Sequence, residues 1–170
     1  MLQSAHSMKG ARKMEAFDEL KLVIARLRAE DGCPWDREQT HASLKAPCIE
    51  EAAEVVCGVN ILEATGNAEN LKEELGDLLL LIIMHAQIAE EEGLFTVEDV
   101  VRGITEKMIR RHPHVFGDAT VSSSEEVLAN WEAIKAQEKI GKADAAGFLP
   151  AAMEESKELI DTAKRRKGYI

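Results

Sequence analysis

One stretch constrains the fold of this chain more than any other: residues 73–89, which read EELGDLLLLIIMHAQIA. A helix turns by about 100° per residue. This rotation places Glu74 on the apolar side of the helix, and Asp77 about 60° away from Glu74 on the same side. Glu73 falls on the polar side, about 100° from Glu74. The side chains that share the face of Glu74 are Leu78, Leu81, His85 and Ile88. We therefore expect a buried helix that carries two carboxylates on its inner face.

The preceding segment repeats this arrangement. In IEEAAEVV, Glu51 and Glu54 stand three residues apart and share one face with apolar side chains, while Glu50 lies at the edge of that face. Two consecutive helices are thus predicted to carry a pair of inward acids each, at i and i+3.

Four carboxylates in apolar surroundings repel one another and lose hydration, which costs several kcal/mol unless they are compensated. A hard divalent cation such as Mg²⁺ or Mn²⁺ resolves the conflict, because it prefers oxygen ligands. The spacing predicts such a site at Glu51, Glu54, Glu74 and Asp77. The alternative is that these acids pair with Lys or Arg, or face water at a helix edge. A ferritin-like di-iron site is disfavoured, because no inward His follows Glu54 or Glu74 by three residues.

The whole chain has an all-α pattern. With 170 residues, 45% hydrophobic and only 4% aromatic, it favours one helical domain over a sheet protein. The predicted divisions are a flexible segment at 1–14, a domain at 15–140 and a helical tail at 141–170 with basic last residues that fray. The expected helices are about 15–31, 44–65, 67–93, 96–113 and 124–139, with a sixth in the tail.

Local signals set the boundaries of these helices. Gly66 is expected to end the second helix, and Asn67 to cap the start of the third. Thr96 and Asp99 have capping-box spacing. Residues 32–43 and 112–124 are expected to be loops.

The net charge of −10 argues against a general nucleic-acid or membrane-surface binder. Three features favour the cytoplasm as the compartment. The three cysteines form no disulfide or zinc-binding pattern, the N-terminus has no apolar signal core, and the apolar runs are too short to span a bilayer.

One basic segment interrupts the acidic chain. Lys107 and Arg111 stand at i and i+4 and share a helix face. Carboxylates, a cation and a basic face together are what a polyphosphate substrate needs. The alternative is a helix C-terminus that prefers cations, which is a reasonable explanation for Arg110, His112 and His114.

Several segments together resemble a known family. They occur in order between about residues 20 and 139 and are GCPWDREQTHASL, EEAAEV, ELGDLLL, IAEEEGLFTVEDV, KMIRRHPHVFGD and WEAIKAQEK. The set is similar to the MazG nucleoside triphosphate pyrophosphohydrolases of the all-α NTP pyrophosphatase superfamily. The resemblance implies a four-helix core with additional helices, in a dimer or higher oligomer whose partner helices complete each active site.

The resemblance also implies an activity: Mg²⁺-dependent cleavage of a nucleoside triphosphate to the monophosphate and pyrophosphate. It assigns metal binding to the four inward acids and makes Glu50 and Glu54 catalytic, with Glu50 either a further ligand or orienting the attacking water. It assigns contacts with the phosphates to Lys107 and Arg111. Substrate contacts fall to Trp131 and Lys135, while Trp35 either covers the core or stacks on a base.

Many members of this family carry two such domains in tandem, whereas this chain has one set of acids. Within the superfamily, a dUTP/dCTP-type or phosphoribosyl-ATP pyrophosphohydrolase is the nearest alternative. Outside it, the alternatives are a non-catalytic nucleotide-binding regulator and a purely structural helix bundle. Non-standard nucleotides are one candidate target of the enzyme.

Overall fold

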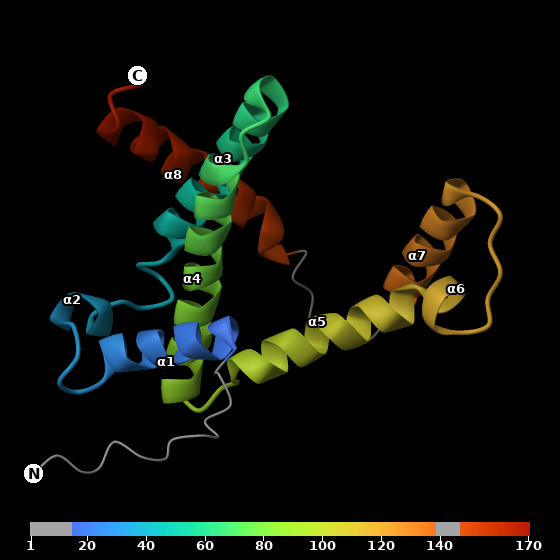
Figure 1. Ribbon diagram of the computed structural model, residues 1–170, viewed down its shortest axis with the longest axis horizontal. Helices are drawn as coiled ribbons and strands as arrows, with labels where there is room; N and C mark the ends of the chain where they lie inside the picture. The colour runs from blue at the N-terminus through green and yellow to red at the C-terminus, as the bar shows by residue number, and fades with distance from the viewer. Residues whose placement is uncertain (1–14, 139–146) are drawn as a thin grey trace, which may run out of the picture. The chain divides into compact units, whose positions relative to one another are not determined.

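The structure is a computed structural model that describes residues 15–138 and 147–170 (Figure 1). These residues form eight helices and no strand, which confirms the predicted all-α class. The predictions for residues 1–14 and 139–146 lie outside the described residues. The helices are α1 Ala16–Arg28, α2 Pro34–Arg37, α3 Lys45–Thr65, α4 Glu69–Glu91, α5 Val97–Arg111, α6 Pro113–Phe116, α7 Ser124–Glu138 and α8 Leu149–Arg166.

Both segments predicted to be loops contain a single helical turn, so those predictions were wrong in part. The two short helices, α2 and α6, begin with Pro34 and Pro113. Proline suits the first helical position, because its fixed φ fits a helix and its missing N–H has no partner to lose there.

The helix ends follow the local signals closely. Gly66 ends α3 in the left-handed conformation, with φ 75°, and Thr96 and Asp99 form the predicted capping box of α5. The N-cap of α4 was predicted one residue too early, because Ala68 and not Asn67 occupies that position. The Asn67 side chain still accepts a hydrogen bond of 2.9 Å from the Glu69 N–H.

The chain forms two compact units that divide after Gln39. In the first unit, α1 contacts α2. The Arg28 guanidinium donates to the carbonyl oxygens of Asp36, at 2.6 Å, and Gln39, at 3.1 Å. These bonds fix the turn that carries Trp35.

In the second unit, α3 and α4 lie side by side, α8 packs against α3, and α5 contacts both α4 and α7 (Figure 1). The α3–α4 pair approaches closely at Gly58, where a Cβ added to the glycine would come within 2.7 Å of the Leu71 Cα. Any larger side chain at that position would push the two helices apart. This close packing sets the distance between the acids of α3 and those of α4.

The hydrophobic core of the second unit is concentrated on α4. Its buried apolar side chains are Leu81, Ile83, Met84, Ala86, Ile88 and Ala89. The apolar side chains of this helix differ in burial, because Ile83 is 3% exposed whereas Leu75 is 50% and Ile82 46% exposed. Apolar surface of α4 therefore remains uncovered by the described chain. Across all the described helices, none has the length and apolar character needed to cross a membrane.

Candidate metal centre

Three carboxylates from α3 and α4 converge on one point. Glu51, Glu54 and Glu74 each offer an oxygen, and these oxygens lie within 4.8 Å of one another. Glu74 is buried, with 9% of its surface exposed, whereas the adjacent Glu73 is exposed. The angular argument from the sequence therefore separated the two adjacent acids correctly.

The carboxylates act on one another electrostatically. Burial raises the pKa of Glu51, and the negative charges of Glu54, Asp77 and Glu74 raise it further. Crowded acids of this kind favour either protonation or a bound cation. Three convergent carboxylate oxygens are donors that suit a hard divalent cation, so the residues present fit Mg²⁺ or Mn²⁺.

Asp77 differs from the other three acids. Its side chain is exposed, and it lies outside the group of converging oxygens. Its charge nevertheless acts on Glu51, so it borders the group. The expectation that Asp77 shares the buried face of Glu74 was wrong, because its rotation of about 60° carries it to the edge of that face.

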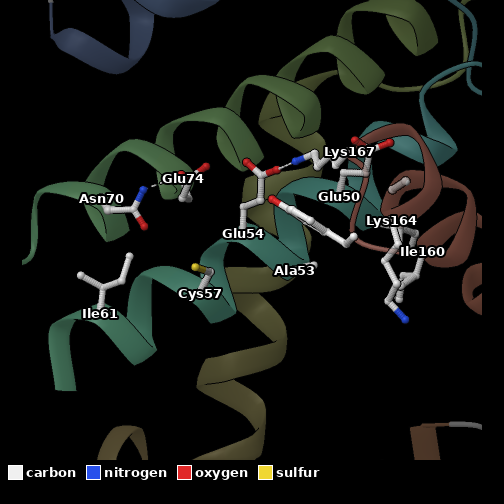
Figure 2. A pocket seen from close by; sticks show the side chains of 13 residues that line it. Glu50, Ala53, Glu54, Cys57, Ile61, Asn70, Glu74, Ile160, Lys164 and Lys167 are labelled. Atoms are coloured by element: carbon white, nitrogen blue, oxygen red, sulfur yellow. Dashed lines mark hydrogen bonds and ion pairs between the residues drawn. The ribbon is translucent and has the colours of Figure 1, made fainter. Parts of the chain in front are cut away.

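Asn70 joins this site, although the sequence argument did not select it. Its Nδ2 donates a 2.8 Å hydrogen bond to Glu74 Oε1, one helical turn along α4 (Figure 2). Its Oδ1 is buried and has no hydrogen-bond partner among the described residues. The i, i+4 spacing of Asn70 and Glu74 was the signal that could have revealed the contact.

Two of the three converging acids, Glu54 and Glu74, border a cavity of about 490 Å³ (Figure 2). Helices α3 and α4 form one side of it, and α8 forms the other. The lining residues include Glu50, Glu54, Asn70 and Glu74 beside an apolar wall of Ile49, Ala53, Ile61, Ile160 and Ala163. A cavity of this size and mixed chemistry is typical of small-molecule sites.

Helix α8 brings cations to the acids. Lys167 Nζ donates to Glu54, and Arg166 donates to Glu50. Neither side chain was predicted from the sequence to have a role. The basic run KRRK in an otherwise acidic chain was the available signal.

The other predicted substrate residues form a second cluster, on α5 and α7. The Arg111 guanidinium lies 5.0 Å from the ring centroid of Trp131 and donates to Glu138 at 2.6 Å. Lys135 pairs with Glu132 at 3.2 Å, and Lys107 is half-buried one turn before Arg111. The hydrogen bond from Arg111 lowers the pKa of Glu138 to about 2. We call Lys107, Arg111, Trp131 and Lys135 the basic–aromatic cluster.

This cluster lies apart from the acids within the chain. Among the described residues, α7 contacts α5 and no other helix, and it stands at the far end of α5 from α4 (Figure 1). Trp35 belongs to the first compact unit and is 68% exposed.

Comparison with known proteins gives a consistent family match. Residues 39–116 match the MazG nucleotide pyrophosphohydrolase domain. The chain is 51% identical over 123 residues to the nucleoside triphosphate pyrophosphohydrolase/pyrophosphatase MazG of Thermotoga maritima, covering 72% of this chain and 45% of that protein. It is 42% identical over 151 residues to the nucleoside triphosphate pyrophosphohydrolase of Escherichia coli K12, covering 85% and 56%.

A third relative is the uncharacterized protein YabN of Bacillus subtilis, 50% identical over 123 residues, covering 72% of this chain and 24% of that protein. The chain thus spans from about a quarter to just over half of the length of these relatives.

Proposed function

We propose that this chain, whose residues 39–116 belong to the MazG nucleotide pyrophosphohydrolase domain family, hydrolyses nucleoside triphosphates to the monophosphate and pyrophosphate. The observation that carries the proposal is the convergence of Glu51, Glu54 and Glu74 beside a cavity of nucleotide-binding size. The names of the Thermotoga and Escherichia relatives, which describe this activity, support it. We assign the reaction to the cytoplasm, in keeping with three free cysteines.

Glu51, Glu54 and Glu74 would hold a divalent cation, Mg²⁺ or Mn²⁺, with Asp77 at the edge of the group. When bound, such a cation polarises phosphoryl oxygens and lowers the pKa of a coordinated water. Glu50 and Glu54 border the cavity and are the candidate acceptors of the proton from the attacking water. We expect the attack at the α phosphorus, so that pyrophosphate is the leaving group and the monophosphate carries the oxygen of the attacking water.

The basic–aromatic cluster would offset the charge that develops on the leaving pyrophosphate, through Lys107, Arg111 and Lys135. Because the cluster lies apart from the acids within the chain, we propose that the active enzyme is a homodimer or a higher homo-oligomer. In such an assembly, one copy supplies the acids and another supplies the basic side chains. The uncovered apolar residues of α4 are consistent with contact between copies.

The substitution Glu74→Ala tests the proposal. It removes a buried ligand, so Mg²⁺-dependent release of pyrophosphate is expected to fall by at least about 100-fold. Circular dichroism should show that the helices persist. The matched control is Glu73→Ala, which changes the adjacent exposed acid and should leave turnover close to that of the wild type. Full activity in Glu74→Ala would refute the assignment of the site.

A panel of ribo-, deoxy- and modified triphosphates, assayed for pyrophosphate release with Mg²⁺, identifies the substrate. Preference for dUTP or dCTP, or for phosphoribosyl-ATP, would move the chain to those branches of the superfamily. A preference for non-standard bases would indicate a role in clearing such nucleotides. A chain that binds triphosphates with Mg²⁺ but releases no pyrophosphate would instead be a non-catalytic regulator.

A further inference from the structure

We propose that the basic end of α8, formed by Lys164, Arg166 and Lys167, is a binding element for the triphosphate of the substrate. The inference rests on the proposed function, and it gives the substrate a second source of positive charge besides the basic–aromatic cluster. It starts from the contacts that Lys167 makes with Glu54 and Arg166 makes with Glu50. Both acids border the same cavity, as do Lys164 and Lys167 themselves (Figure 2).

The end of α8 is held in place by its own backbone. The Gly168 N–H donates to the Arg165 carbonyl at 3.1 Å, and the Tyr169 N–H donates to the Lys164 carbonyl at 2.9 Å. Gly168 has φ 74°, so this pair of bonds is a Schellman motif that closes the helix and turns the chain. Tyr169, which follows this turn, also lines the cavity.

A second contact fixes the other end of α8 against α3. Lys45 Nζ donates to Glu155 at 2.9 Å, across the packed helices. With contacts to α3 near both ends, α8 forms one wall of the cavity. Substrate in that cavity would meet Ile160 and Ala163 on the apolar part of the wall and the lysines at its end.

The charges decide what Lys167 would bind. Its ammonium pairs with Glu54, one of the three converging acids. A divalent cation at the same carboxylate competes for those oxygens and repels the ammonium. A triphosphate carries more negative charge than one divalent cation neutralises, and Lys binds phosphate oxygens through strong charge-assisted hydrogen bonds. The phosphates in this cavity are therefore the partner that Lys167 would take next.

The test compares Lys167→Gln with wild type in binding a non-hydrolysable triphosphate analogue in the presence of Mg²⁺, measured by calorimetry. Loss of one ammonium–phosphate contact is expected to weaken binding about tenfold. In turnover assays, KM should rise by a similar factor, while kcat changes little. Lys167→Arg keeps the charge and should restore most of the affinity.

The matched control is Lys157→Gln, which removes a lysine from the same helix. Its ammonium pairs with Glu154 and does not line the cavity. Analogue binding in this variant should equal that of wild type. A loss there as large as in Lys167→Gln would mean that the net charge of α8 matters rather than the position of Lys167, and would overturn the proposal.

Two further results would also overturn it. If Lys167 merely blocks the acids, Lys167→Gln would bind the analogue more tightly than wild type, and unchanged affinity would show that Lys167 has no role. A different result would refute the proposed function: release of no pyrophosphate by the wild type from any triphosphate. Analogue binding still tests the role of Lys167 in that case.

Discussion

At the scale of single residues, the site depends on how the carboxylates are held. Glu74 is buried, and Asn70 Nδ2 is the hydrogen-bond donor that the structure gives its side chain. A ligand held in one orientation binds a cation more tightly than a mobile one, because less conformational freedom is lost on binding. We therefore assign Asn70 a positioning role, acting on the cation through Glu74.

The substitution Asn70→Ala tests this role. Removing the donor frees the Glu74 carboxylate, and the expected result is binding of Mn²⁺ weakened by about tenfold to 100-fold. Titration of Mn²⁺, followed by electron paramagnetic resonance, measures the affinity without any turnover. Asn60→Ala is the control, since Asn60 is exposed on α3. Equal Mn²⁺ affinity in wild type and Asn70→Ala would exclude the positioning role.

At the scale of helices, the α5–α7 contact includes an ion pair formed by one ionised acid, Glu138. Arg110 and Arg111 both donate to Glu138, and the pKa of Glu138 falls from 4.5 to about 2. A depressed pKa means that the folded form favours the carboxylate. The stabilisation is therefore fully present above about pH 4.5 and is lost as the pH falls towards 2.

Glu138→Gln should accordingly lower the melting temperature at pH 7, and the difference from wild type should shrink between about pH 5 and pH 2. Thermal unfolding followed by circular dichroism across this range measures it. Glu132→Gln, which changes an exposed acid on the same helix, gives the baseline. A difference between wild type and Glu138→Gln that stays constant with pH would show that the ionised pair does not stabilise this contact.

The helices show which features of the fold and of the candidate site could be predicted from the sequence. Helix bounds and the capping box were predictable because they depend on residues a few positions apart. The inward acids of α3 and α4 were predictable because a helix is rigid and its rotation can be counted. The contacts of Glu54 and Glu50 with α8 were not, since Lys167 and Arg166 lie more than 100 positions along the chain. Only the packing of α8 on α3 brings them there.

At the scale of the whole molecule, the chain separates the two groups of residues that we propose form the reaction centre. The acids lie on α3 and α4, whereas Arg111 and Trp131 meet where α5 contacts α7. The residues are those the proposed chemistry requires, but within one chain they are not adjacent. A second copy that supplies the basic–aromatic cluster resolves this separation.

Complementation between two inactive variants tests that arrangement. Glu74→Ala lacks a proposed metal ligand, and Lys107→Ala lacks a proposed phosphate contact but retains both members of the Arg111–Glu138 pair. Co-expression with two different tags allows the mixed dimer to be purified. If acids and basic residues from different copies form each site, the mixed dimer contains one intact site of two and should show about half of the wild-type activity.

The two homodimers, carried through the same purification, set the background for this measurement. If instead each chain forms its own complete site, every site in the mixed dimer lacks one essential side chain. Its activity would then equal the mean of the two defective homodimers. The outcome thus distinguishes a site shared between copies from one that a single chain completes by moving α5 and α7 towards the acids.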